Sequence, residues 1–446
     1  MRTTPSRLRR ALGDMLRVLL VAAALAAWIT LPWPGALALA IALAAWLAST
    51  RSGRQARSVA WVGIGTLPQR LGAAAVIVVG IAGVVGVFVA LLAMADGYAH
   101  TLRATGSLDT AIVLRGGSAS EVMSVLDRES LTLIPQAEGV ARDEAGVPLA
   151  SAELVVAANL PLAGSARGDE GSVQLRGVGD AAWAVRPNVR IVAGRRFRAG
   201  LRELVVGRGA ARQFAGLEPG RELKLGTERW TVVGIFASGD ALESEVWGDA
   251  AVIAGTYRRG SSRASVTARL ADAGSLATFE QALAANPRLK VDVSTTLDYF
   301  SRQSERVTQI LRVVGFTVAA IMAVGAVFGA LNTMFAAVAA RAREIATLRA
   351  IGFPGPPVVV AVMIETMLLA LAGGAAGGAL AYLVFDGYGA STMAAGAVGK
   401  LDFELRVTPA LLWAGLQWSL AIGFVGGLFP ALRAARLPVT AALREL

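Results

Sequence analysis

The sequence VAARAREIATLRAIGF, residues Val338–Phe353, joins two long apolar segments, Val313–Ala337 and Val358–Phe385. Each segment has the length and apolar character of a helix that crosses a membrane. The joining stretch is basic, and short basic loops between membrane helices lie on the cytoplasmic side. One interpretation is therefore a positively charged loop that only sets the orientation of the two helices.

The same stretch also has the periodicity of an amphipathic helix, which we expect over residues 340–352. Ile345, Leu348 and Ile351 recur at every third position, which predicts a narrow apolar stripe. Gly352 is a helix stop signal, and the prolines that follow separate this helix from the next apolar segment. The charged residues of the other side are Arg341, Arg343, Glu344 and Arg349.

The composition is that of a membrane protein. Of the 446 residues, 55% are hydrophobic and the mean hydropathy is +0.56, whereas soluble chains are about 45–50% apolar. The formal net charge is +11, and all but three of the 43 basic residues are arginine. Many arginines stand beside apolar segments, where they fix orientation and meet anionic lipid. No basic run is interleaved with aromatic residues, so a nucleic-acid partner is not expected.

We expect a membrane α-helical bundle with four core transmembrane helices, an N-terminal hydrophobic hairpin and an inserted α+β domain on the outer side. The core spans are Leu71–Ala95, with Asp96–Tyr98 at its outer end, then 313–337, 358–385 and 411–429. Small residues spaced by three or four allow close helix approach, either within one bundle or between two subunits. They are Gly80, Gly83, Gly86, Gly325, Gly329, Gly373, Gly377, Gly423 and Gly427.

Residues 1–57 comprise a basic N-terminus and two apolar arms, Val18–Leu31 and Ala36–Ala48, separated by the turn Pro32–Gly35. Arginines flank both outer ends, which predicts that both ends are cytoplasmic. Each arm is shorter than the about 20 residues of a full span. The sequence favours a tight helical hairpin, and a re-entrant or surface-lying pair is the alternative. Residues 58–98 then supply a semi-polar element and the first core span.

Residues 99–305 contain no apolar run long enough to cross a membrane, and they predict a soluble α+β domain, in two lobes, on the outer side. Residues 118–127, 209–214 and 275–284 predict short helices. Short runs separated by glycine and proline predict a mixed sheet: 111–114, 152–157, 173–178, 189–192, 203–206, 222–225, 230–236, 265–270 and 289–293.

Three carboxylates, Glu243, Glu245 and Asp249, gather in the stretch ESEVWGD. A carboxylate pair for acid–base chemistry is one interpretation, and a solvated loop is the interpretation that we favour. Residues 294–311 are polar with helical periodicity and lead directly into the second span. They predict a stalk that carries displacement between the membrane and the outer domain.

The remaining polar residues give little sign of catalysis. No GxxxxGK[ST] motif occurs, so the chain is not expected to bind or hydrolyse ATP, and it is not expected to be an enzyme. With no cysteine and a single histidine, His100, a metal site is not expected. Glu365 lies about two turns inside the third span, where a carboxylate is costly. It could take part in a proton step, contact an arginine near the cytoplasmic face, or, as we favour, reach the membrane interface.

The segment REIATLRAIGF resembles the cytoplasmic coupling helix of FtsX-like and MacB-like ABC-transporter permeases of the mechanotransmission class. Residues 343–345 match the REI element and 348–352 the LRAIG element, while 430–436 with Pro438 and 442–444 look like the closing motif of the family. The resemblance implies that residues 306–446 form an FtsX-like domain and that 99–305 form a MacB-like periplasmic core domain. It implies ATPase docking through Arg341, Arg343, Glu344, Ile345, Leu348, Arg349, Ile351 and Gly352.

The function that follows from this resemblance is that of an inner-membrane permease subunit, paired with a second permease subunit and driven by a separate ABC ATPase that binds ATP and magnesium. Its periplasmic domain would move to export or extract a lipoprotein, lipid, peptide or hydrophobic drug. The alternatives are a mechanotransmission regulator of a periplasmic partner, such as a cell-wall hydrolase, without transport, and a membrane receptor with no ATPase.

Overall fold

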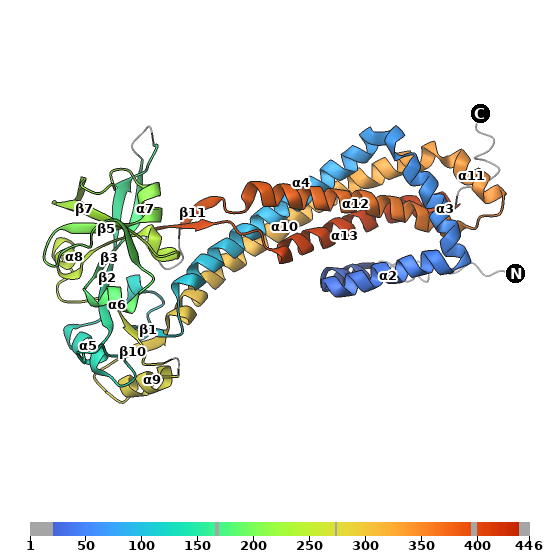
Figure 1. Cartoon of the computed structure of the whole chain (residues 1–446). Helices are drawn as coiled ribbons and strands as arrows, with labels where there is room; N and C mark the ends of the chain where they lie inside the picture. Colours follow the sequence, from blue (N-terminus) through green and yellow to red (C-terminus); the bar gives the residue numbers. More distant parts are fainter. Residues whose placement is uncertain (1–20, 166–168, 273, 394–398, 437–446) are drawn as a thin grey trace, which may run out of the picture. The chain divides into compact units, whose positions relative to one another are not determined.

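The computed structural model describes residues 21–165, 169–272, 274–393 and 399–436. The basic residues up to Arg17 and the end of the closing motif from Pro438 onward lie outside this part. The chain divides into two compact units. The helical unit comprises Met1–Ala93, Arg312–Asp386 and Arg406–Leu446, and the sheet unit comprises Met94–Leu311 and Gly387–Leu405. Figure 1 labels many of the elements of both units.

Long apolar helices make up the helical unit. In the described part of the chain, four helices are long and apolar enough to cross a membrane: Leu67–Thr105, Thr296–Ala340, Gly355–Phe385 and Pro409–Arg436. Each predicted core span lies within one of them. The elements are α2 (Trp33–Ser49), α3 (Arg51–Gly65), η1 (Leu67–Arg70), α4 (Leu71–Thr105), α10 (Thr296–Ala340), α11 (Ala342–Ala350), α12 (Gly355–Phe385) and α13 (Pro409–Arg436).

Helix α12 lies at the centre of the contacts in this unit, because it packs against both α13 and α3. Its glycines allow these close approaches, since a Cβ on Gly374 would lie 2.3 Å from Ser419 Oγ of α13. The buried side of α3 consists of small or β-branched residues: Gly53, Ala56, Val59, Ala60 and Gly63. Short side chains on both helices therefore let α3 lie directly against α12.

The N-terminal arms differ from the predicted boundaries. Residues 21–29 and α2 are helical, as the hairpin interpretation requires. The predicted boundary between residues 57 and 58 is wrong, because α3 runs without a break from Arg51 to Gly65 and makes a 98° bend with α2. The arginines that were expected to close the hairpin instead form the first two turns of this amphipathic helix.

Helix α4 continues to Thr105, past Asp96–Tyr98, so the helix does not stop at the predicted outer end of the first span. Gly97 is not a stop signal here. It permits close contact, since a Cβ at this position would lie 2.1 Å from the backbone oxygen of Glu404. The predicted continuity of the stalk is confirmed, because α10 is a single helix of 45 residues, about 68 Å long at 1.5 Å per residue.

The sheet unit is built on one mixed sheet, in the order β10-β1-β9-β2-β3-β8-β5-β7-β4 with β6 paired to β7. Only the β3–β8 and β5–β7 pairs are parallel among the pairings described. The strands are β1 (Thr110–Arg115), β2 (Ala150–Pro161), β3 (Glu170–Val178), β4 (Arg190–Gly194), β5 (Glu203–Gly207), β6 (Glu222–Leu225), β7 (Glu228–Ala237), β8 (Glu245–Asp249), β9 (Ser265–Arg269) and β10 (Val291–Thr295).

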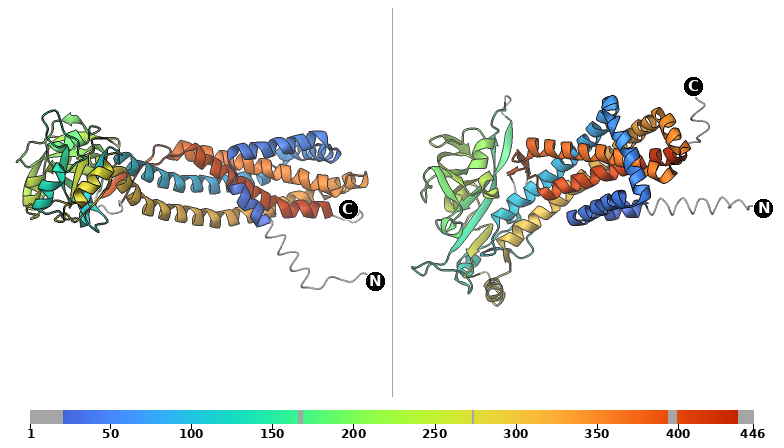
Figure 2. Two further views of the ribbon diagram at one scale, coloured as in Figure 1. Left: turned by 90° about the horizontal axis from the view of Figure 1, so that it is seen from below. Right: turned by 45° about the vertical axis from the view of Figure 1, so that its right-hand side comes forward.

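Separate hydrophobic cores divide this sheet into two lobes (Figure 2). One core packs β1 and β9 against α5 (Arg128–Leu133) and α9 (Leu276–Ala284). Two others cover the part built from β3, β5, β7 and β8, with α6 (Ala181–Val185), α7 (Arg208–Gln213) and α8 (Ala250–Thr256). Strand β2 joins the lobes, because its first residues pair with β9 and the remainder with β3.

Three predictions for the sheet unit are wrong. Residues 118–127 hold only the short 3₁₀ helix η2 (Glu121–Met123) in place of the expected helix. The expected solvated loop at ESEVWGD is a buried strand, β8. Finally, the outer loop after α12 contains β11 (Gly389–Met393) and β12 (Lys400–Glu404), which belong to the sheet unit. The predicted span 99–305 therefore omits part of this unit.

Candidate functional site

The predicted coupling helix is α11, and its local sequence accounts for both of its ends. A single residue, Arg341, separates it from α10, because Arg341 leaves the helical conformation, with φ −102° and ψ 10°. It ends in a Schellman motif, in which Gly352 has φ +105°. The N–H of Phe353 donates to Leu348 O at 3.1 Å and that of Gly352 to Arg349 O at 3.2 Å. The prediction that Gly352 stops the helix is confirmed.

The predicted apolar stripe of α11 is not a free docking surface. Ile345 is 4% exposed, and Leu348 packs against Val59 of α3 and Ala361 of α12, whereas Ile351 is 69% exposed. Positions three apart fall about 60° short of a full helical turn, so Ile351 lies about 120° round the axis from Ile345. The interpretation of the three residues as one stripe is therefore wrong.

The exposed side of α11 forms a different surface. It comprises Arg343, Glu344, Thr347, Ala350, Ile351 and Gly352; Arg349 is half-buried. We call this set the α11 surface. It retains one large exposed apolar side chain, that of Ile351, beside charged neighbours.

Arg341 is also not part of this surface. It is buried, and its Nη1 lies 3.1 Å from Glu365 Oε2 of α12, while its Nε lies 3.1 Å from Glu344 Oε2. Glu365 is itself only 4% exposed. Of the three interpretations of this carboxylate, contact with an arginine is the one that the geometry supports. The favoured interpretation, that Glu365 reaches the interface, is wrong, because α3 and α11 cover it.

The predicted packing glycines separate into two groups. A Cβ on Gly373, Gly377, Gly423 or Gly427 would lie between 2.4 and 2.9 Å from another helix of the same chain. Gly86 lies more loosely, 3.7 Å from Gly377 O by the same measure. Gly80, Gly83, Gly325 and Gly329 have nothing within 4 Å of such a Cβ. The first group therefore packs this chain, and the second, on α4 and α10, is open.

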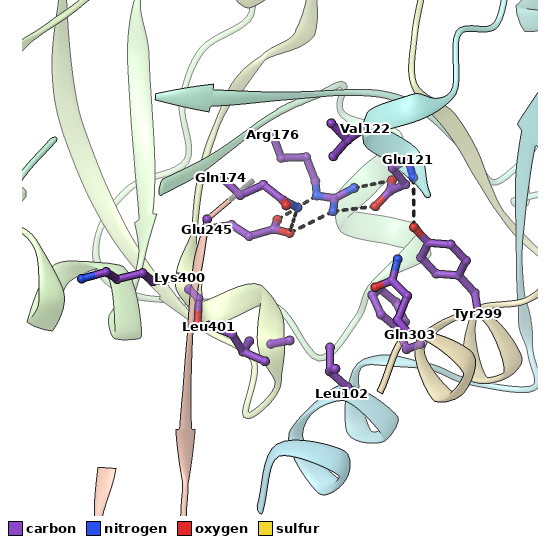
Figure 3. A pocket seen from close by; sticks show the side chains of 14 residues that line it. Leu102, Glu121, Val122, Gln174, Arg176, Glu245, Tyr299, Gln303, Lys400 and Leu401 are labelled. Carbon is purple, nitrogen blue, oxygen red and sulfur yellow. Dashed lines mark hydrogen bonds and ion pairs between the residues drawn. The ribbon is translucent and has the colours of Figure 1, made fainter. Parts of the chain in front are cut away.

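A second cluster of charge lies in the sheet unit, around Arg176 of β3 (Figure 3). Its guanidinium contacts Glu245 of β8, with Nε to Oε2 at 2.7 Å, Glu121 of η2, with Nη1 to Oε1 at 2.8 Å, and Glu153 of β2, with Nη1 to Oε2 at 2.7 Å. With the further bonds from Nη2 to Glu121 and Glu245, all five N–H groups of the arginine are used. We call these four residues the Arg176 cluster.

The partners of the Arg176 cluster complete its hydrogen bonding. Ser265 donates to Glu121, and Gln174 and Trp247 donate to Glu245. Burial opposes ionisation of Glu153, but the nearby charges of Arg186 and Arg176 outweigh it and hold the pKa of Glu153 below its ordinary value. Burial likewise opposes the charge of Arg176, yet the facing carboxylates Glu121 and Glu245 raise its pKa well above the ordinary value.

Each of the three carboxylates of ESEVWGD has a structural partner. Glu245 belongs to the Arg176 cluster, Glu243 lies 3.1 Å from Arg208 Nη2, and Asp249 caps α8 by accepting from the N–H groups of Ala251 and Val252. The cavity beside the cluster measures about 50 Å³, which holds only one or a few waters. Among the described residues no group of acidic or histidine side chains could hold a metal ion. This geometry supports a structural role for the cluster.

Residues 72–286 match the MacB-like periplasmic core domain, and residues 297–439 match the FtsX-like permease C-terminal domain. The chain belongs to the FtsX-like and MacB-like ABC permeases. This permease is thus a membrane protein with a MacB-like periplasmic domain, and the α11 segment falls inside its FtsX-like part. Both matches begin after residue 71, so the N-terminal arms and α3 lie outside them.

Curated relatives cover less of the permease. It is 30% identical over 241 residues to Macrolide export ATP-binding/permease protein MacB 1 of Yersinia pestis bv. Antiqua (strain Antiqua). The aligned region covers 51% of this chain and 35% of that protein. It is 33% identical over 149 residues to the MacB protein of Shewanella sp. (strain ANA-3), covering 33% and 22%. The permease thus spans about a third or less of the length of these two relatives.

Two solved structures are similar at a low level. The extracellular domain of the noncanonic ABC-type transporter YknZ from Gram-positive bacteria gives a TM-score of 0.32 at 15% identity, covering 42% of this chain and 98% of that chain. The periplasmic region of MacB from Actinobacillus actinomycetemcomitans gives 0.32 at 12% identity, covering 42% and 89%. At these scores the two similarities carry no argument about the permease.

Proposed function

We propose that the chain is the membrane subunit of an ABC transporter in the inner membrane, driven by a separate ATPase that binds ATP and magnesium. The observation that carries the proposal is the covalent continuity of α10. Strand β10 ends at Thr295 and α10 begins at Thr296, while α11 begins two residues after α10 ends at Ala340. A stiff helix with no loop at either end is suited to carry a displacement of α11 to the sheet.

The ATPase would bind the α11 surface from the cytoplasmic side, on which the basic residues of this segment are expected. Ile351 supplies an apolar anchor, and Arg343 supplies a cation for acidic groups at the rim of the partner's groove. Leu348 and Ile345 support this surface from within, because they pack against α3 and α12.

The ATPase proposal is tested with Ile351→Asp in the full chain, reconstituted in membranes with its ATPase. We expect stimulation of ATP hydrolysis to fall at least tenfold while the unfolding midpoint stays unchanged, because Ile351 is 69% exposed. The matched control is Val147→Asp, which alters an exposed apolar residue of the sheet unit. Full stimulation by the Ile351 variant, or failure of any ATPase to copurify with the unaltered chain, would contradict the proposal.

A second permease subunit is part of this proposal. The open glycines Gly80 and Gly83 of α4 and Gly325 and Gly329 of α10 support it, because no side chain of the described chain fills the space beside them. The chain contains no cysteine, so Gly83→Cys and Gly325→Cys can be introduced singly. Oxidative cross-linking into a dimer is the expected result, whereas only monomers in native membranes would contradict a homodimer.

The cargo is the finer part of the proposal. We infer export or extraction of an apolar substrate, a lipoprotein, lipid, peptide or hydrophobic drug, and the relatives named as macrolide exporters support the last class. The other outcome is control of a periplasmic enzyme such as a cell-wall hydrolase. A photo-cross-linking residue in the sheet unit separates the two, since an adduct with a small apolar molecule supports transport and an adduct with a folded enzyme contradicts it.

A further inference from the structure

Two buried polar contacts of the helical unit are not used by the proposed function. The first is the joint at Arg341, the single residue between α10 and α11. The backbone of Arg341 accepts the N–H of Ile345 at 3.0 Å, so it belongs to the start of α11. Its side chain reaches across to α12, where Nη1 lies 3.1 Å from Glu365 Oε2. One residue therefore sets both the bend of the chain and its attachment to a neighbouring helix.

The third wall of this joint is α3. A Cβ on Gly63 would lie 3.0 Å from Arg341 Nη1 and 3.0 Å from Glu365 Oε2, so the backbone of α3 passes directly over the ion pair. Glu344 of α11 faces Arg341 from the exposed side. Three elements, α3, α11 and α12, thus meet at one carboxylate and one guanidinium.

An ion pair in this place is an expensive way to hold helices together, because apolar side chains of similar volume often do so at least as well. It does supply directed geometry, since a guanidinium and a carboxylate hold one orientation. We propose that Arg341 and Glu365 are positioning residues that make α12 and α3 follow α11. A movement that the ATPase imposes on α11 is then passed to α3 and α12 as well. This inference rests on the proposed function.

The test uses Glu365→Gln and Arg341→Lys in the full chain reconstituted with its ATPase. We expect copurification of the ATPase to persist, because neither residue belongs to the α11 surface, while stimulated ATP hydrolysis falls about tenfold for Glu365→Gln. Arg341→Lys keeps the positive charge but loses the planar guanidinium and its fixed donor geometry. This variant should therefore retain an intermediate level of ATPase stimulation. The exchange Arg341→Glu with Glu365→Arg should recover part of the loss.

The control is Thr366→Ala, which alters a buried neighbour on α12 whose hydroxyl bonds Val362 O of the same helix. It should leave stimulation within about twofold. Full stimulation by Glu365→Gln while the unaltered chain binds an active ATPase would overturn the positioning role alone. Absence of any ATPase from the unaltered complex would instead overturn the proposed function, so the two failures are distinguishable.

The second contact lies at the turn between the N-terminal arms. Gln417 of α13 is 4% exposed, and its Nε2 donates to Trp28 O and to Leu31 O, each at 2.8 Å. In return, Trp28 Nε1 donates to the backbone oxygen of Gln417 at 3.0 Å. Trp413 Nε1 adds a longer bond to Leu31 O at 3.4 Å. We call these contacts the Gln417 clamp.

Other groups of the turn satisfy the backbone locally. The hydroxyl of Thr30 donates to Ala26 O and Ala27 O, and the N–H groups of Gly35 and Ala36 donate to Pro32 O. Pro34 has no N–H to satisfy at the start of α2. A turn in water needs no such arrangement, whereas a turn in hydrocarbon must pair its backbone groups within the protein.

The position of Gln417 agrees with a turn in hydrocarbon. It lies eight residues from the start of α13 at Pro409, about 12 Å along the helix at 1.5 Å per residue. Helix α2 has 17 residues, about 25 Å, which is shorter than a hydrocarbon core of about 30 Å. We infer that residues 21–49 form a re-entrant hairpin, which enters and leaves on the same side and is held within the membrane by the Gln417 clamp.

The natural absence of cysteine makes this topology testable. Trp33→Cys at the turn and Arg51→Cys at the start of α3 are labelled with a membrane-impermeant maleimide, in intact cells and in inverted vesicles. We expect no labelling at residue 33 from either side, and labelling at residue 51 in inverted vesicles only. Labelling at residue 33 in intact cells would overturn the re-entrant topology.

The clamp has its own readout. Gln417→Leu leaves the turn carbonyls of Trp28 and Leu31 without their amide donor, so labelling of the residue 33 cysteine should rise severalfold in one of the two preparations. Gln417→Asn, which keeps the amide on a shorter stem, should give a smaller rise. Unchanged labelling in Gln417→Leu would show that Gln417 does not hold the hairpin.

Discussion

The two buried groups of arginine and glutamate in this chain are built in opposite ways. Arg176 of the sheet unit uses all five N–H groups on three buried carboxylates, which accept further bonds from Ser265, Gln174 and Trp247. Arg341 of the helical unit has one buried partner, Glu365, and one half-exposed partner, Glu344. Arg176 therefore has no free N–H group with which to form a new bond, whereas Arg341 can exchange its half-exposed partner Glu344 for water.

The difference teaches that burial alone does not indicate the role of a charge. The Arg176 cluster joins strands β2, β3 and β8 within one sheet, where any movement would break several bonds together. The Arg341–Glu365 pair joins separate helices at the residue where α10 gives way to α11. A small movement there breaks a single ion pair. We therefore expect the first to contribute mainly to stability and the second mainly to coupling.

The largest expected effect is that of Arg176→Met, which leaves Glu121, Glu153 and Glu245 facing one another without their arginine. Breaking a buried ion pair from one side costs about 3–5 kcal/mol, and here three carboxylates lose their partner. Urea unfolding is followed by tryptophan fluorescence, to which Trp230 and Trp247 in the cores of the sheet unit contribute. Arg229→Met, at an exposed pair with Glu222, should leave the unfolding midpoint unchanged.

A midpoint for Arg176→Met within experimental error of the unaltered chain would remove the contrast between the two groups. It would mean that the three carboxylates take up protons at little cost. The Arg176 cluster would then have no special structural weight.

The next effect in size is that of Gly63→Val, which places a side chain against Arg341 and Glu365. Overpacking of a buried contact costs about 1–3 kcal/mol, and we expect a further loss of coupling because α3 is moved off the ion pair. The control is Gly65→Val at the end of the same helix, since a Cβ there has nothing within 4 Å. Equal behaviour of the two variants in ATPase stimulation would contradict the role of α3 at this joint.

The smallest expected effect is the pH dependence of the Arg176 cluster. The pKa of Glu153 is lower in the folded chain than the ordinary 4.5, so its ionised form stabilises the fold above that value. This contribution is lost as the pH falls from about 4.5 through the lowered pKa. Glu153→Gln lacks the titrating group, so its urea midpoint should change less than that of the unaltered chain over this window. If the urea midpoints of the two chains fell in parallel with pH, Glu153 would not be the group responsible.

Local signals in the sequence were sufficient where a single residue type decides the structure. Gly352 ends α11 because only glycine readily adopts its positive φ, and the run of apolar residues locates the long helices. The family resemblance of the α11 segment was confirmed by the matches to both domains. The role of the segment in ATPase docking and the dimer stay predictions.

Predictions from the sequence failed where residues distant in the chain decide the environment of a side chain. Glu245 lies in a buried strand because Arg176, 69 residues away, satisfies its charge, and no local pattern reports this partner. The position of Leu348 depends on Val59 and Ala361, which are far from it in sequence. The same holds for Glu365, whose arginine lies before α11, and for Gln417, whose partners belong to the first residues that the structure describes.

The chain passes between the helical unit and the sheet unit four times, near residues 93, 311, 386 and 405. Two of these passages lie inside the unbroken helices α4 and α10. A single linker constrains an attached body least, and each further covalent connection adds a constraint. The loop after α12, by contributing β11 and β12, therefore limits the freedom of the domain to which it adds.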